Sequence, residues 1–136
     1  MTSAPVLIEG YAAIFGAVDL SGDVVRAGAF ARSLKSAPVP MLLQHRQGGI
    51  AGRWTRIIED GRGLFVRGLI ERPSAQTLAR AGLDGLSIGF RARLWTPRVG
   101  GGRDLKEVDL VEVSLVAEPM QPLARFKQIG TAARAA

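Results

Sequence analysis

Three residues from separate segments of the sequence, Ser87, His45 and Glu112, have the side-chain types that nucleophilic hydrolysis requires. A serine hydroxyl is a weak nucleophile until a base removes its proton, and histidine titrates close enough to neutral pH to act as that base. A carboxylate can hold the imidazole in one tautomer and stabilise its protonated form. Because His45 is the only histidine in the chain, a histidine-dependent serine hydrolase would have to use it.

Ser87 and His45 also have ordinary structural interpretations. The segment GLSIGFR (residues 85–91) alternates apolar and polar residues, so a strand places Ser87, Gly89 and Arg91 on its polar face. A serine on such a face commonly does no more than meet solvent. His45 follows a short apolar run, where a histidine commonly packs against a neighbour or caps the strand.

Glu112 lies in the segment DLVEVSLV (residues 109–116), which predicts a second strand. One face carries Val111, Val113 and Leu115. Glu112 and Ser114 share the other face with Leu110 and Val116, so this face is not freely solvated. A carboxylate among apolar neighbours is costly to bury without a partner, and that partner is either one of the many arginines or the histidine.

Other catalytic and metal-binding signatures are absent from the sequence. There is no Gly-x-Ser-x-Gly elbow, no Ser-x-x-Lys motif and no glycine-rich phosphate loop. The residues Asp19, Ser21, Gly22 and Asp23 resemble the start of a calcium loop, but its twelfth position is Phe30 rather than glutamate, so we interpret them as turn formers. The chain has no cysteine, and we expect neither a metal ion nor a cofactor.

Alternating apolar runs separated by turn residues predict a chain made mostly of strands. The expected strands are residues 6–15, 40–44, 86–99 and 104–118, together with a hairpin over residues 50–71 whose Asp60-Gly61 turn needs a positive φ at glycine. Short helices are expected over residues 28–36 and 72–82, the second beginning at Pro73 and ending at Gly82.

These elements favour a small closed antiparallel β-barrel with two short helices, because a small open sheet would expose long strand edges. The length of 136 residues fits one domain, which we place at residues 1–126. We expect residues 127–136 to be a loosely ordered C-terminal tail.

The net charge of +6 and a sequence pI of about 11.0 are compatible with a protein that binds a polyanion. A basic β-barrel that binds nucleic acid without catalysis is therefore the alternative function, with Trp54 and Trp95 as candidate stacking residues. The arginines are scattered rather than clustered, however, which makes nucleic acid the less favoured partner. The sequence shows neither a signal peptide nor an apolar run that could span a bilayer.

The order of the motifs resembles the phage prohead proteases, which are capsid-maturation serine proteases related in fold to the herpesvirus assemblins. The resemblance extends from about Glu9 to Phe126. It rests on EGYAAIFGAVDLSGDVVRAGAFARSL, on MLLQHR followed by IAGRW, on GLSIGFRAR and on LVEVSLVAEPMQPLARF, in family order. The resemblance implies the small β-barrel of assemblin-like proteases.

The resemblance also implies roles for the three residues. Ser87 would be the nucleophile and His45 the general base. Herpesvirus relatives use a second histidine as the third member, which this chain lacks, so the third member should be acidic. Glu112 occupies the position that matches the Glu-Val-Ser segment of the family. Asp109 and Glu107 are weaker candidates, because alternation along the strand puts them on the opposite face.

Family members cut the scaffold or the scaffold-like segment of the major capsid protein inside the immature shell. For this chain the resemblance implies a serine endopeptidase that acts in the bacterial cytoplasm, inside the assembling procapsid, and a possible homo-oligomer. We expect backbone N–H groups, aided by Arg91, to hold the oxyanion. A degenerate member that serves only as a scaffold component is the other alternative, and the joint presence of all three residues argues against it.

Overall fold

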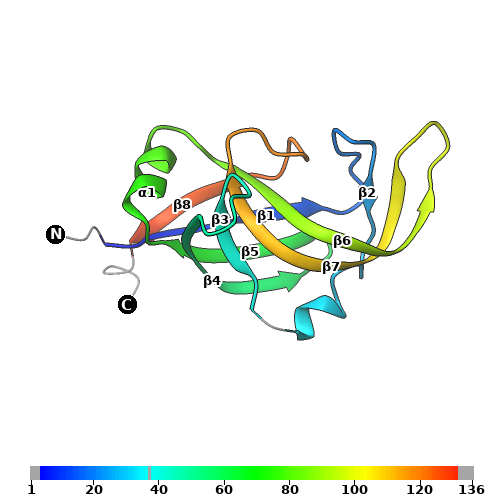
Figure 1. Ribbon diagram of the computed structural model, residues 1–136, viewed down its shortest axis with the longest axis horizontal. Helices are drawn as coiled ribbons and strands as arrows, with labels where there is room; N and C mark the ends of the chain where they lie inside the picture. The colour runs from blue at the N-terminus through cyan, green and yellow to red at the C-terminus, as the bar shows by residue number, and fades with distance from the viewer. Residues whose placement is uncertain (1–3, 37, 132–136) are drawn as a thin grey trace.

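The computed structural model describes residues 4–36 and 38–131. In these residues the chain is mainly β, with one α-helix and one 3₁₀ turn (Figure 1). The strands, in chain order, are β1 (Val6–Ile14), β2 (Val24–Val25), β3 (Pro40–Leu43), β4 (Ile50–Glu59), β5 (Gly63–Ile70), β6 (Gly85–Pro97), β7 (Arg103–Val116) and β8 (Phe126–Thr131). The 3₁₀ turn η1 covers Ser33–Lys35, and the helix α1 covers Pro73–Arg80.

The strands form one mixed sheet in the order β2-β7-β3-β4-β5-β1-β8, with β6 paired to the other side of β7. Strands β2 and β3 both run parallel to β7, whereas every other pair is antiparallel. The expectation of a purely antiparallel sheet is therefore wrong. Tight turns predict antiparallel neighbours, but β2 and β3 pair with a strand far along the chain, whose direction no local turn sets.

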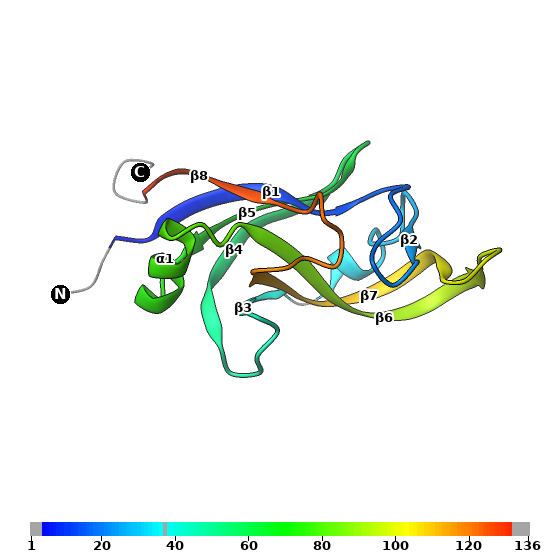
Figure 2. The same cartoon turned by 90° about the horizontal axis from the view of Figure 1, so that it is seen from above.

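The sheet is not closed, so the predicted closed barrel is also wrong. Seen from above, β8, β1 and β5 lie on one side and β6 and β7 on the other (Figure 2). Around the gap, β6 meets the segment before β8 only at a bridge between Gly85 and Arg125. Two backbone hydrogen bonds flank it, from the Leu86 N–H to the Ala124 carbonyl and from the Phe126 N–H to the Asp84 carbonyl. The segment between β7 and β8 therefore meets β6 at one short bridge, and the two do not form a continuous ladder.

The sheet bends around one apolar core, to which nearly every strand contributes. The largest fully buried apolar side chains are Phe30, Ile8, Met41, Leu64, Ile70, Leu86, Leu105 and Leu115. Because they come from segments that span most of the sequence, the core fixes the long strands β6 and β7 against β1 and β3. Those four strands carry or border the residues proposed to do chemistry.

A bulge in β7 changes the expected division of residues between its two faces. Gly89 of β6 lies opposite Glu112, but the next residue, Phe90, lies opposite Leu110, so Val111 is skipped in the ladder. Val111 is therefore 39% exposed, whereas Leu110 joins the buried core. The prediction that Leu110 shares a face with Glu112 is wrong, because strict alternation does not survive an extra residue.

The structure also tests three predictions about local elements. Helix α1 is confirmed, and Gly82 follows it with a φ of 113°. The helix expected over residues 28–36 is reduced to η1, because a left-handed Gly28 starts a series of turns that bury Phe30. The β4–β5 hairpin is confirmed, but Gly61 does not have a positive φ; the Asp60 carboxylate closes this turn by accepting the N–H groups of Arg62 and Gly63.

Part of the predicted C-terminal tail, residues 127–131, is a strand in the structure. Residues 127–131 belong to β8, which pairs antiparallel with β1, and residues 132–136 lie outside the described part of the chain. None of the helices in the described part of the chain has the length and apolar character needed to cross a membrane.

Candidate active site

His45 lies in a tight turn immediately after β3, not in the strand itself. Gln44 and His45 have φ values of 53° and 60°, in the left-handed region that residues other than glycine seldom adopt. Contacts to β7 hold this turn: the Gln44 N–H donates to the Leu115 carbonyl at 2.9 Å, and the His45 N–H donates to Ser114 Oγ at 3.2 Å. The turn directs the imidazole back over β7 while leaving it partly exposed.

Glu112 is the partner of this imidazole. Its carboxylate is buried, and its Oε1 lies 2.5 Å from His45 Nδ1. The hydroxyl of Ser114 donates to the same oxygen at 2.7 Å. Among the described residues, no arginine forms an ion pair with Glu112, so the alternative of an arginine partner is not supported. A carboxylate at Nδ1 favours the tautomer whose proton is on Nδ1, and this leaves Nε2 free to accept a proton.

Gly89 makes room for the Glu112 side chain. The two residues are opposite each other in the β6–β7 ladder, and the Glu112 side chain crosses the backbone of β6 where Gly89 has no side chain. A Cβ at this position would lie 2.8 Å from Glu112 Cδ and closer still to Cγ. The glycine in the motif GLSIGFR therefore has a specific packing role, which alternation alone did not reveal.

Ser87 lies two residues before Gly89 on the same face of β6, directly opposite Ser114. Ser87 is only 7% exposed, so the interpretation of a freely solvated surface serine does not hold. Ser87 and His45 line one cavity of about 220 Å³. The apolar part of its lining consists of Ala12, Ala13, Val25, Leu86, Ile88, Phe90 and Met120. A peptide side chain of moderate size fits a cavity of this volume and character.

The other candidates lie apart from this cluster. Arg91 is exposed, follows the bulge and does not line the cavity. Glu107 and Asp109 both form ion pairs with Arg32 at 3.2 Å, and Asp109 also pairs with Arg93 at 3.4 Å. Their carboxylates are thus engaged with arginines, whereas that of Glu112 faces the histidine.

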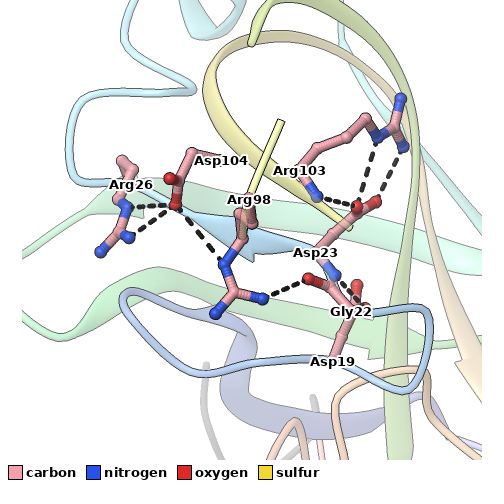
Figure 3. A network of polar contacts seen from close by, with 7 residues as sticks. All are labelled: Asp19, Gly22, Asp23, Arg26, Arg98, Arg103 and Asp104. Atoms are coloured by element: carbon pink, nitrogen blue, oxygen red, sulfur yellow. Dashed lines mark hydrogen bonds and ion pairs between the residues drawn. The ribbon is translucent and has the colours of Figure 1, made fainter. Parts of the chain in front are cut away.

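One wall of the cavity is the loop over residues 19–23, and its conformation is fixed by polar contacts (Figure 3). Asp19 Oδ1 accepts hydrogen bonds from the N–H groups of Ser21 and Asp23, at 2.8 and 2.9 Å. Asp23 is buried. Its carboxylate accepts hydrogen bonds from the Arg103 guanidinium, at 2.8 and 3.2 Å, and from the Arg103 backbone N–H at 2.9 Å. The Arg103 guanidinium holds the pKa of Asp23 below its ordinary value.

Further contacts attach this loop to the outer half of the β6–β7 hairpin, which Figure 1 shows extending past β2. Arg98 donates to the Gly22 carbonyl at 2.7 Å, and Asp104 lies 2.6 Å from Arg26 and 3.9 Å from Arg98 (Figure 3). The sequence identified residues 19–23 as turn formers but gave no sign of Arg98 or Arg103 as their partners. A partner about 80 residues away leaves no local pattern.

The described residues contain no group of three or more histidine, cysteine, aspartate or glutamate side chains that could hold a metal ion. The polar residues that line the cavity are Asp19, Ser21, Asp23, His45, Ser87, Arg103 and Gln121, and the Glu112 carboxylate contacts His45 from outside this lining.

Comparison with known sequences assigns the chain to a family. The profile of the Caudovirus prohead serine protease family matches residues 2–134. The chain belongs to this family. The prohead protease of Enterobacteria phage HK97 is 33% identical to it over an alignment of 93 residues, and the alignment covers 62% of this chain and 41% of that protein. The chain therefore aligns with less than half the length of this curated relative.

Solved structures share the fold at lower identity. The crystal structure of KSHV protease in complex with a hexapeptide phosphonate inhibitor superposes with a TM-score of 0.67 and 16% identity, covering 94% of this chain and 66% of that one. The bacteriophage T4 capsid assembly protease, gp21, gives a TM-score of 0.69 and 15% identity, covering 85% of this chain and 88% of that one. The assemblin-like fold expected from the sequence is thus confirmed, although its sheet in this chain is open.

Proposed function

We propose that this chain is a serine endopeptidase in which Ser87 is the nucleophile, His45 the general base and Glu112 the third member. The single observation that carries the proposal is the contact between His45 Nδ1 and the buried Glu112 carboxylate, on an imidazole that shares a cavity with Ser87. An imidazole bound this way at Nδ1 presents Nε2 to a hydroxyl, which is the arrangement that activates a serine. Membership of a serine protease family supports the same assignment.

In the proposed reaction, Ser87 Oγ attacks a peptide carbonyl while His45 Nε2 takes the hydroxyl proton. Glu112 stabilises the imidazolium that forms, without itself accepting the proton. The oxyanion is assigned to backbone N–H groups beside the cavity, and a contribution from Arg91 stays a prediction. His45 then gives its proton to the leaving amine. A water molecule, deprotonated by His45, releases the acyl group and restores the serine.

The proposed substrate is the major capsid protein or a scaffold segment, cut inside the assembling procapsid in the bacterial cytoplasm. The family description and the name of the T4 neighbour, a capsid assembly protease, support a capsid-related substrate. The net charge of +6 would favour association with an acidic segment of such a substrate. Self-association of this chain is part of the proposal, in keeping with the assemblin-like resemblance.

The test is co-expression of the chain with its capsid protein, comparing wild type with Ser87→Ala and His45→Gln. Each variant should lower the cleavage rate by roughly 10⁴-fold or more, because a nucleophile and its base act as a unit. Ser33→Ala, which removes a serine hydroxyl that does not line the cavity, is the matched control and should cleave normally. Equal shortening of the capsid protein by wild type and Ser87→Ala would show that the nucleophile is assigned wrongly.

No observation favours the nucleic-acid alternative over this proposal. The indole N–H of Trp54 donates to the Val113 carbonyl and its ring packs against the core, while Trp95 lies on a different strand beneath Arg103. Many arginines form ion pairs with carboxylates: Arg26, Arg32, Arg53, Arg67, Arg93, Arg98, Arg103 and Arg125.

A further inference from the structure

Ser114 is a fully buried polar residue at the centre of the site, and the proposed hydrolytic reaction assigns it no role. Its backbone lies in the middle of β7, paired with Leu42 of β3 on one side and with Ser87 of β6 on the other. A hydroxyl in such a position costs free energy unless both its hydrogen and its oxygen are used. Its neighbours Val113 and Leu115 are fully buried apolar residues, as the middle of a central strand normally requires.

Both hydrogen bonds of this hydroxyl go to groups of the site. Ser114 Oγ donates its proton to Glu112 Oε1 at 2.7 Å, the same oxygen that contacts His45 Nδ1. It also accepts the backbone N–H of His45 at 3.2 Å. One side chain thus contacts the third member of the proposed triad and the backbone of the proposed base.

The Glu112 carboxylate and the His45 backbone both depend on neighbouring contacts to keep their conformations. Glu112 is a buried carboxylate, and a hydroxyl donor fixes its orientation. His45 adopts a left-handed backbone conformation, which persists only where surrounding contacts maintain it. Removing the hydroxyl would leave the carboxylate free to rotate and the His45 N–H without its acceptor.

We infer that Ser114 is a positioning residue of the site, which holds the Glu112 carboxylate and the His45 turn in mutual register. The expected effect on catalysis rests on the proposed function. The positioning itself is a property of the protein without substrate. Loss of the hydroxyl should lower kcat and leave KM nearly unchanged, since Ser114 does not line the cavity. The expected decrease in kcat is roughly 10-fold to 100-fold, from the loss of one hydrogen bond to a charged group.

The chain's single histidine allows a direct spectroscopic test. All imidazole ¹⁵N signals belong to His45, so the tautomer can be read without assignment by mutation. In the wild type we expect the Nδ1–H tautomer to dominate, with a downfield Nδ1–H proton resonance from the bond to Glu112. In Ser114→Ala we expect that resonance to weaken and the two tautomers to average. Ser114→Cys keeps the size of the side chain with a weaker donor, and it serves if the alanine variant does not fold.

Ser33→Ala is the matched control, because Ser33 Oγ also accepts a backbone N–H of β7, that of Leu110 at 2.8 Å. It should leave the His45 signals and kcat unchanged. Unaltered tautomer signals in both Ser114 variants would overturn the inference, as would a loss of kcat no larger than that of Ser33→Ala. Failure of the proposed function is a separate result, because it appears as full cleavage by Ser87→Ala, while the resting-state spectra do not depend on cleavage.

Discussion

The tight packing of Gly89 against Glu112 gives the sharpest prediction, which concerns Gly89→Ala. The added methyl group would lie 2.8 Å from Glu112 Cδ and nearer to Cγ, whereas ordinary contact begins at 3.4 Å. The clash involves the stem of the glutamate and not only its mobile end. The carboxylate must therefore retreat from β6, and its 2.5 Å contact with His45 Nδ1 is the contact that this movement lengthens.

The size of the effect follows from the geometry. Glu112 Cδ must move by about 0.6 Å or more to regain normal contact, and a displacement of about 1 Å at a catalytic group can cost roughly 100-fold in rate. We expect kcat to fall by about 30-fold to 100-fold, equivalent to about 2 to 2.7 kcal/mol in activation free energy. KM should change little, because Glu112 does not line the cavity.

The assay is steady-state cleavage of purified capsid protein, with the free energy of unfolding measured in urea for each variant. Gly61→Ala is the matched control: a methyl group added at Gly61 would meet no heavy atom within 4 Å, and Gly61 has no positive φ, so this substitution should leave kcat unchanged. A double-mutant cycle with Glu112→Ala then tests the route of the effect. Gly89→Ala should add little once the glutamate is absent.

Two outcomes would contradict this reasoning. The first is a Gly89→Ala protein with wild-type kcat, which would mean that the Glu112 carboxylate adapts without losing its function. The second is an equally large loss in the wild-type and Glu112→Ala backgrounds, which would mean that Gly89 acts through another group.

Two further predictions concern stability. The pKa of Asp23 is lowered, chiefly by its hydrogen bond with Arg103, so Asp23 stabilises the fold above its unfolded-state pKa and loses this contribution as pH falls through its folded-state pKa. Urea titrations should therefore show wild-type stability declining from about pH 4 downward more steeply than that of Asp23→Asn, and parallel curves would refute the assignment. Phe30→Ala should lower the free energy of unfolding by about 3 to 5 kcal/mol, because Phe30 is fully buried; a cost below about 1 kcal/mol would contradict its place in the core.

The residue types and the alternation of strands predicted a good part of the candidate site. Ser87 and Gly89 fall on one face of β6, and Glu112 and Ser114 fall on one face of β7, as alternation requires. This worked because the ladder is regular from Gly85 to Gly89. It failed one residue later, at Val111, because a bulge leaves no clear mark in a run of apolar residues.

The parts that the sequence did not predict depend on contacts between distant segments. The left-handed turn at Gln44 and His45 contains neither glycine nor asparagine, the residues that usually signal such a conformation. The parallel pairing of β3 with β7, which stabilises this turn, joins segments with no local connection. The same holds for Arg103, whose partner Asp23 is known only once the hairpin is placed.

The separation between His45 and its partner has a consequence during synthesis. The imidazole and the Glu112 carboxylate are 67 positions apart, and the acceptor of the His45 N–H lies later still. A ribosome-bound chain that has made β3, β4 and β5 therefore lacks every side chain needed to orient its histidine. The contacts that orient this imidazole can therefore form only after nearly the whole domain has been synthesised.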